Sequence, residues 1–199
     1  MKILAFSDLH LSASHAADIV AASAGADLVI GTGDFCNCRQ GLDRAVALLA
    51  GLQAPMVAVP GNGESADELR AAGLPDTTVL HGEGGAFEGL RLFGLGYGVP
   101  ETPFGSWSCD LSETQAAAML AACARADILI CHSPPKGLGD LTSGGQSVGS
   151  TAIRAAAERI RPKLLLCGHV HDCWGFRGTL GKTQVANLGP SVSWFEVAP

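Results

Sequence analysis

The sequence predicts a layered α/β fold, and three observations support this prediction. Short apolar runs alternate with helix-like segments along the 199 residues. Each apolar run is bounded by small or polar residues, as a short buried strand is. Each run is also followed by a residue of a metal-binding type, and open α/β sheets present their ligands at strand ends. The expected strands are Lys2–Phe6, Asp27–Gly31, Met56–Val59, Asp127–Cys131 and Leu164–Cys167.

The segments between these strands carry helical signals. The apolar residues of Leu42–Leu49 recur at helical spacing. Leu111–Ala126 is the clearest helix, because Ser112 and Gln115 have the spacing of a capping box. The other expected helices are Ala16–Ala24, Ala66–Ala72 and Ser150–Arg159, the last with Ser150 or Thr151 as its N-cap.

The remaining segments complete the expected sheet and its rim. Thr78–Leu95, rich in glycine, predicts a strand or hairpin that crosses the middle of the chain. Phe176–Ala186 and Val192–Val197 are expected to be closing strands. Gly96–Asp110 and Pro134–Gly149 are expected to be loops at the rim of a pocket. Neither an internal repeat nor a linker interrupts the pattern, so we expect one domain over residues 1–199.

Composition narrows the class of protein. A hydrophobic fraction of 47% with 16% charged residues is typical of a globular chain. The net charge of −6, without a basic block, argues against an extended nucleic-acid footprint. No apolar segment reaches the roughly 18 residues of a membrane span or begins the chain with a signal-peptide core of roughly 7–15 residues. The seven widely spread cysteines indicate reduced thiols, so we expect a cytoplasmic protein.

The residues that follow the strands form a set of metal ligands. Carboxylate, amide and imidazole groups together suit divalent Mn, Fe or Zn. Because they follow strands of one fold, we expect them to meet at a single site that holds two ions. One carboxylate, that of Asp34, can bridge two ions through its two oxygens. The seven expected ligands are Asp8, His10, Asp34, Asn62, His132, His169 and His171.

In its motifs and their order, the chain resembles the calcineurin-like metallophosphoesterase superfamily, in particular its small prokaryotic members. The resemblance covers essentially the whole chain and implies a four-layer αββα sandwich of two mixed sheets. It also implies that the metal site lies at the carboxyl ends of the strands. The motifs that carry it are Asp8-Leu9-His10, Gly33-Asp34, Gly61-Asn62-Gly63-Glu64, Cys131-His132-Ser133-Pro134-Pro135 and Gly168-His169-Val170-His171.

The same resemblance implies an allotment of ligands to two ions, with Asp34 bridging them. The cofactors would be two divalent ions, with Mn the metal most favoured for activity. They would hold a bridging hydroxide that attacks a phosphate ester, and Asp34, Asn62 and His132 would take part in catalysis. One ion would take Asp8, His10, Asp34 and His171, and the other Asp34, Asn62, His132 and His169.

Position 63 departs from the family pattern. Many members carry a histidine where this chain has Gly63, and general acid catalysis of that kind is worth about 10²–10⁴-fold. Gly63 is expected not to touch the metal ligands, so metal binding should survive. Three explanations stay open: substrates with good leaving groups, a substitute acid, or a slow enzyme that is mainly a binding module. The candidate substitutes are His15, Glu64 and His81.

We therefore expect a metal-dependent phosphoesterase that acts on a phosphodiester or a nucleotide-like small molecule. A first alternative is a pyrophosphate-cleaving hydrolase of lipid-precursor type, which the run from Ser7 to Ser12 resembles, although those enzymes have Arg at position 63. A second is a non-catalytic scaffold, whose only support is Gly63. The expected partner is a small phosphorylated substrate, with no membrane partner, and a homodimer is left open.

Other residues leave alternatives open. Phe104 and Trp107 are expected to stack a base or to form a dimer contact. The stretch Gly137–Gly149 predicts either backbone amides that approach phosphate or a plain rim. Glu64 is expected to be either the hydrogen-bond partner of a metal-binding histidine or a solvent-facing residue at a helix start. Arg39 is expected to be a solvated charge.

Five further residues have mainly structural interpretations. Cys36 and Cys38 are interpreted as loop thiols rather than a soft-metal site, because no second pair of cysteines lies nearby. His81 lies far from every motif and is expected to be structural. Trp174 and Phe176 are expected to pack against the sheet.

Overall fold

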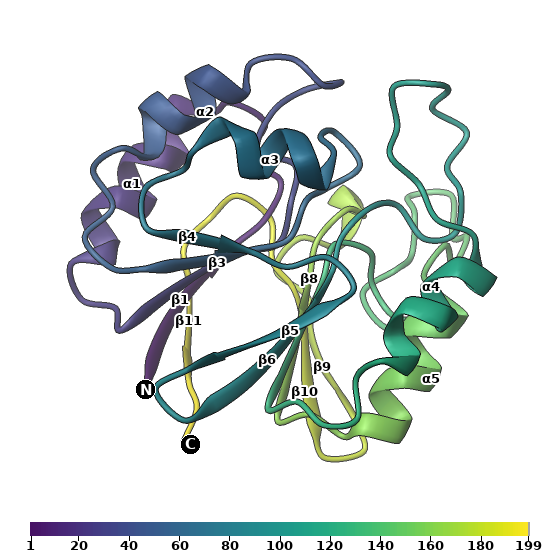
Figure 1. The fold of residues 1–199 in the computed structure, drawn as a ribbon. Coiled ribbons are helices and arrows are strands. Elements are labelled where there is room, and N and C mark those ends of the chain that lie inside the picture. Colours follow the sequence, from purple (N-terminus) through teal and green to yellow (C-terminus); the bar gives the residue numbers. More distant parts are fainter. Residues whose placement is uncertain (199) are drawn as a thin grey trace.

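In the computed structural model, which describes residues 1–198, two mixed sheets pack face to face (Figure 1). Pro199, the last residue of the predicted domain, lies outside the described residues. The first sheet has the order β11-β1-β2-β3-β4 and the second β5-β6-β7-β8-β10-β9. The strands of the first sheet are β1 (Lys2–Phe6), β2 (Leu28–Gly31), β3 (Met56–Ala58), β4 (Thr77–Val79) and β11 (Ser193–Glu196). Those of the second are β5 (Glu83–Phe87), β6 (Leu90–Leu95), β7 (Ile128–Cys131), β8 (Leu164–Cys167), β9 (Arg177–Leu180) and β10 (Thr183–Asn187).

Helices cover the outer face of each sheet, so the molecule has the predicted four layers (Figure 1). The alternation of side chains along a strand divides its residues between two cores. In β1, Ile3 and Ala5 face the space between the sheets, whereas Leu4 and Phe6 face the outer helices. Since both faces of the central strands are buried, these strands are continuously apolar. The helices are α1 (Ala13–Ser23), α2 (Leu42–Leu49) and α3 (Ala66–Ala72) on the first sheet, and α4 (Glu113–Ala121) and α5 (Thr151–Ile160) on the second.

The direction of the strands brings distant parts of the chain to one edge of the sandwich. Strands β1 to β4 run parallel to one another, and so do β6, β7, β8 and β10. The outermost strands β11, β5 and β9 are antiparallel to their neighbours. The carboxyl ends of the parallel strands of each sheet therefore lie together, which is where the predicted ligands follow them.

Most predicted helices begin and end close to the predicted residues. The capping box of α4 is present, with the Gln115 N–H donating to Ser112 Oγ at 3.2 Å and the Ser112 N–H donating to Gln115 Oε1 at 2.9 Å. Its predicted end at Ala126 is wrong. Arg159 of α5 donates to the carbonyl oxygens of Leu120 and Cys123 at 2.8 and 2.7 Å. These bonds satisfy the last carbonyls of a helix that ends at Ala121.

Two segments contain tight turns, one where a strand or hairpin was predicted and one where a single strand was predicted. The stretch Thr78–Leu95 contributes β4 to one sheet and the β5–β6 hairpin to the other. Glu88 and Gly89, which join the hairpin, have φ of 43° and 87°, as a type I′ turn requires. The predicted single strand Phe176–Ala186 is a second hairpin, β9–β10, which turns at Gly181 with φ of 61°.

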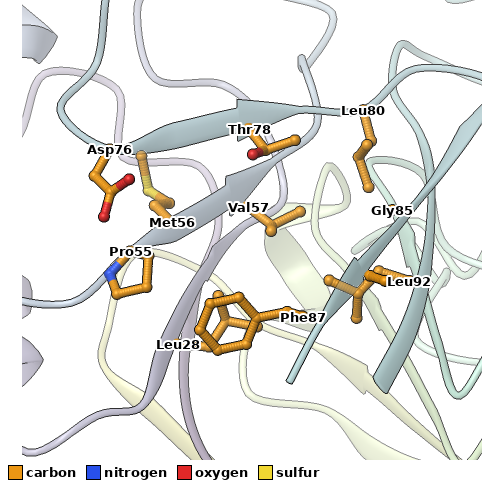
Figure 2. Close-up of a pocket in the computed structure, with 11 residues that line it drawn as sticks. Leu28, Pro55, Met56, Val57, Asp76, Thr78, Leu80, Gly85, Phe87 and Leu92 are labelled. Carbon is orange, nitrogen blue, oxygen red and sulfur yellow. The ribbon is translucent and has the colours of Figure 1, made fainter. Parts of the chain in front are cut away.

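Strands β4 and β5 are edge strands of the two sheets, and residues of both line a cavity (Figure 2). This cavity of about 160 Å³ lies near the amino ends of β2 and β3. Its walls are mainly apolar and include Leu28, Met56 and Phe87. This end of the sandwich is opposite to the strand ends that carry the predicted ligands. Among residues 1–198, no helix is both long enough and apolar enough to cross a membrane.

Candidate metal centre

All seven predicted ligands converge at the carboxyl edge of the two sheets. Each residue follows its strand by one to four positions, in loops that meet above the sandwich. We describe them as an outer group, an inner group and one carboxylate between them. The outer group is Asp8, His10 and His171; the inner group is Asn62, His132 and His169; the carboxylate between them is Asp34.

The outer group brings two imidazoles and a carboxylate to one point. His10 Nε2 lies 3.2 Å from His171 Nε2, and His171 Nε2 lies 3.9 Å from Asp8 Oδ1. One ligand atom from each of the three residues lies within 4.8 Å of the others. Asp8 is buried, whereas the two imidazoles are partly open to solvent. This group therefore faces the cleft.

The inner group is equally close and more deeply placed. Asn62 Oδ1 lies 3.1 Å from His132 Nε2 and 3.0 Å from His169 Nδ1. The two imidazole nitrogens are 3.2 Å apart. Both Asn62 and His132 are buried. The resemblance implied these three residues as ligands of one ion, and they do lie together.

Asp34 joins the two groups through one oxygen. Its Oδ2 lies 3.6 Å from His10 Nε2 and 3.6 Å from His132 Nε2. Its Oδ1 accepts a hydrogen bond from the Gly63 N–H at 2.7 Å. Oδ2 is therefore the oxygen that faces both groups, and the bridging of two ions by Asp34 stays a prediction. The expectation that Gly63 does not touch a metal ligand is wrong.

The chemistry of the donor set fits two divalent ions. The Nδ1–H of His132 donates to the carbonyl oxygen of Thr32 at 2.8 Å, and that of His10 to Asn37 Oδ1 at 2.8 Å. Both bonds direct the lone pair of Nε2 into the centre. Ligands about 2.1 Å from a tetrahedral ion lie about 3.4 Å from one another. The separations in the two groups, from 3.0 to 3.9 Å, are close to that value.

The backbone at the ligands is unusual, and glycines make room for it. Asp8, His10, Asp34 and His169 have φ of 51°, 46°, 56° and 69°, which is the left-handed region that non-glycine residues rarely adopt. The chain turns sharply after each strand and points these side chains back over the sheet edge. A Cβ atom on Gly61 would lie only 2.0 Å from Asp34 Oδ1. Such strained residues cluster at functional sites.

The electrostatics of the centre follow from burial among opposite charges. Burial, with the nearby Asp34, raises the pKa of Asp8, although His132 opposes this shift. Burial opposes the charging of His132, but Asp34 and Asp8 outweigh it and raise its pKa. Burial, reinforced by His132, lowers the pKa of His169 to about 3. His169 is therefore neutral at pH 7, which is the form of imidazole that binds a metal.

Glu64 has a role that neither interpretation of the sequence anticipated. Its side chain is fully buried, and its Oε1 accepts hydrogen bonds from the Asp34 N–H at 2.9 Å and the Gly61 N–H at 2.7 Å. It contacts no metal-binding histidine, and it does not face solvent. It is not the residue that starts α3 either, because the next residue, Ser65, is the N-cap of that helix. Burial raises the pKa of Glu64 to about 7. The carboxyl group holds two ligand-bearing loops together.

Three residues around the centre were not anticipated from the sequence. The indole Nε1–H of Trp174 donates to Asp8 Oδ2 at 2.9 Å, and its ring lies 4.3 Å from that of His171, so the prediction that Trp174 packs against the sheet is wrong. Asn37 orients His10, as described above. Asn187 Nδ2 donates to the carbonyl oxygen of Gly168 at 3.1 Å, next to His169. Only the position of Trp174, three residues after the last ligand, was a signal in the sequence.

The candidate substitutes for the missing acid lie elsewhere. His15 Nδ1 is 2.9 Å from Ser12 Oγ, and His81 Nδ1 accepts from the Gly96 N–H at 3.2 Å. Burial lowers the pKa of His81 to about 4, which agrees with its expected structural role. Neither histidine is among the residues that line the cleft over the centre, and Glu64 is buried below it.

The other residues that the sequence singled out also have local partners. Arg39 pairs with Glu68 at 2.7 Å. Within the described part of the chain, no cysteine belongs to a candidate metal cluster. The amides of Gly137 and Gly149 donate to Asp140 at 2.9 and 3.0 Å. That loop supplies none of the described residues that line the cleft. These two amides therefore donate to a carboxylate of their own loop and not to a group in the cleft.

The cleft over the centre has a volume of about 300 Å³. Five of the predicted metal ligands form the floor of the cleft, and two aromatic residues of the loop Gly96–Asp110 form one wall. The rings of Phe104 and Trp107 are nearly parallel, with an interplanar angle of 4° and centroids 5.8 Å apart. The lining residues are His10, Asp34, Asn62, Phe104, Trp107, His169 and His171.

Known structures share this fold. Protein TT1561 of Thermus thermophilus aligns with a TM-score of 0.75 at 16% identity, over 98% of this chain and 97% of that chain. A dimetal phosphatase from Danio rerio aligns with a TM-score of 0.65 at 14% identity, over 96% of this chain and 88% of that chain. At such identities the similarity establishes the architecture alone.

A curated relative matches part of the sequence. The UPF0046 protein T07D4.2 of Caenorhabditis elegans is 34% identical over 103 residues, which is 49% of this chain. The match spans only 26% of that protein, so the chain corresponds to a limited part of its relative.

A family model settles the membership. The model of the calcineurin-like phosphoesterases matches residues 1–173, a range that includes every predicted ligand. This family uses a dinuclear divalent metal site, and the Asp and His side chains of the centre are able to bind metal. The resemblance inferred from the motifs is confirmed, and the chain belongs to the calcineurin-like phosphoesterase family.

Proposed function

We propose that this protein hydrolyses a small phosphodiester or another phosphate ester with a good leaving group. The observation that carries the proposal is the position of Asp34 Oδ2, 3.6 Å from a histidine of each ligand group. One oxygen shared by two donor groups suits a pair of neighbouring ions. The proposed ligands are Asp8, His10, Asp34, Asn62, His132, His169 and His171.

Each part of the centre has a distinct task in this reaction. When bound, two divalent ions stabilise charge on the phosphate oxygens and activate the attacking water. Asp34, Asn62 and His132 hold the two donor groups in register and are the residues we assign directly to catalysis. His10 and His171, which are partly exposed, border the space that the phosphate enters. The mixed oxygen and imidazole donors suit divalent Mn, Fe or Zn, and of these we propose Mn²⁺ as the metal that supports activity.

The lack of a proton donor supports a substrate with a good leaving group. Position 63 is glycine, and His15, His81 and Glu64 do not line the cleft. Without general acid catalysis, a poor leaving group loses about 10²–10⁴-fold in rate. The cleft lining also holds neither Lys nor Arg among the described residues, so the second negative charge of a monoester gains no added protein cation.

We propose that the protein acts in the cytoplasm on a small phosphorylated molecule. Support comes from the seven cysteines, all unpaired within residues 1–198, and from the small cleft. The structurally similar Danio rerio protein is a dimetal phosphatase, which is consistent with the proposed chemistry.

The test compares two activated esters. Metal-free protein is loaded with Mn²⁺, and hydrolysis of bis(p-nitrophenyl) phosphate and p-nitrophenyl phosphate is measured, with protein kept in EDTA as the control. We expect metal-dependent turnover and a higher kcat/KM for the diester. Faster turnover of the monoester would overturn the substrate preference. Binding of two ions without turnover of either ester would favour the scaffold alternative, and faster cleavage of a pyrophosphate diester would favour the lipid-precursor type.

A further inference from the structure

The aromatic wall of the cleft has no role in the proposed hydrolysis. Phe104 is 51% exposed, although Trp107 in the same loop is half-buried. The Phe104 ring stands edge-on to His169, with centroids 6.5 Å apart. An exposed aromatic side chain beside a proposed metal ligand is not explained by packing.

The loop that carries these rings is tied to the metal centre. Asn62 Nδ2, on the side chain that faces His132 and His169, donates to Ser108 Oγ at 3.0 Å. The Cys109 N–H donates to the Asn62 carbonyl oxygen at 2.9 Å. These two hydrogen bonds attach the loop that carries Phe104 to Asn62 of the inner group. The loop is therefore held at a fixed position next to the proposed ligands.

The carboxylate of Asp110 accepts hydrogen bonds from two other residues of this loop. Asp110 Oδ2 accepts from the Thr102 N–H at 3.0 Å, and Asp110 Oδ1 accepts from Ser108 Oγ at 2.9 Å. The two ends of the loop are thereby closed around Phe104 and Trp107. Since Trp107 lies parallel to Phe104, the pair is an ordered aromatic surface rather than a single exposed ring.

The chemistry of the cleft restricts what this surface can contact. Within the described residues, the lining offers imidazoles, one carboxylate, one amide and the two aromatic rings, with no Lys or Arg. A second phosphate or a carboxylate on the substrate would find no cation there. A flat, uncharged group would find a parallel aromatic surface, and stacking of a base on such a surface is worth about 1–3 kcal/mol.

We propose that Phe104, supported by Trp107, binds the nucleobase of a nucleotide substrate whose phosphate lies at the metal centre. This inference rests on the proposed function and adds to it the class of substrate and the residue that selects it. Phe104 is a specificity residue, since it contacts the part of the substrate that does not react.

The test measures binding, so it is independent of turnover. The affinities of adenosine 5′-monophosphate and ribose 5-phosphate, which differ only in the base, are measured by calorimetry on the Mn²⁺-loaded protein. We expect the nucleotide to bind about tenfold more tightly. In Phe104→Leu, which keeps the apolar bulk, the two affinities should become equal, whereas in Phe104→Trp the nucleotide should still bind more tightly. Trp194→Phe, at an exposed aromatic residue of β11, is the control and should leave the ratio unchanged.

The outcomes separate this inference from the proposed function. Equal affinities in the wild type, with ribose 5-phosphate bound, would overturn the inference and leave the phosphate site intact. Failure of both phosphates to bind, while two ions are bound, would overturn the inference, and the diester assay described above would then test the proposed function separately. Sedimentation velocity distinguishes the remaining explanation: a wild-type dimer that dissociates in Phe104→Leu would show that the aromatic wall is a contact between two copies of the chain.

Discussion

The inner and outer groups of the metal centre contain similar donors in different surroundings. His132 of the inner group has no exposed side-chain surface, whereas the side chains of His10 and His171 in the outer group are 30% and 49% exposed. His132 is oriented by a backbone carbonyl, that of Thr32, and His10 by a side chain, that of Asn37. The comparison indicates that His132 binds from a buried position fixed by the backbone, whereas His10 and His171 lie where a substrate can reach them.

Asp34→Asn should have the largest effect, because it changes the one oxygen that joins the groups. Asparagine keeps the shape and an acceptor for the Gly63 N–H, but it removes the negative charge shared by the two donor sets. We expect loss of both ions after dialysis and a fall in kcat/KM of at least about 10³-fold. Metal analysis and the diester assay provide the measurements. Retention of both ions at wild-type affinity would contradict the role assigned to this oxygen.

Matched substitutions in the two groups should then have unequal effects. His132→Gln removes a buried imidazole with a fixed partner, and His171→Gln removes an exposed one. We expect that raising the Mn²⁺ concentration will not restore the lost ion or the activity of His132→Gln. In His171→Gln, we expect activity to recover as the Mn²⁺ concentration is raised. Activity measured against metal concentration distinguishes them. Equal rescue of both variants would remove the basis of the comparison.

Trp174→Phe should weaken the outer group selectively. Phenylalanine keeps a ring beside His171 but loses the hydrogen bond from Nε1 to Asp8 Oδ2. Loss of such a supporting bond typically costs about 10–100-fold in metal affinity. Calorimetric titration with Mn²⁺ should show one weakened site and one unchanged site. If the affinity for Mn²⁺ falls equally at both sites, the assignment of Asp8 to the outer group alone is wrong.

Gly63→His should have the smallest effect and tests the missing acid. A histidine there adds a proton donor, but its Cβ would lie 3.0 Å from Asp34 Oδ1 and 3.2 Å from the Cys36 carbonyl oxygen. We therefore expect an increase of about tenfold in turnover of phenyl phosphate, whose leaving group is poor, below the roughly 10²–10⁴-fold of a well-placed acid. Gly63→Ala introduces the same crowding without the acid and serves as the control. Unchanged or lower turnover in the histidine variant, with both ions bound, would contradict the assignment.

Much of this architecture could be predicted from local patterns. The continuous apolar run of Ile3–Phe6 predicts a short buried strand, although only the structure shows that Ile3 and Ala5 face one core and Leu4 and Phe6 the other. The capping box of Ser112 predicts where α4 begins. Its end could not be predicted, since Arg159, 36 residues beyond Cys123, caps the last carbonyls. Local signals end where a distant residue completes the hydrogen bonding.

The ligand types and their order along the chain were readable from the sequence, because metal chemistry restricts which side chains can serve. Which oxygen of Asp34 faces both groups, why Glu64 lies beneath it and how Trp174 reaches Asp8 were decided by tertiary contacts. Those contacts join residues 30 and 166 positions apart, and they depend on left-handed turns at Asp8 and Asp34. A backbone conformation that is unfavourable in isolation is stable only when the surrounding fold holds it, so no local pattern encodes it.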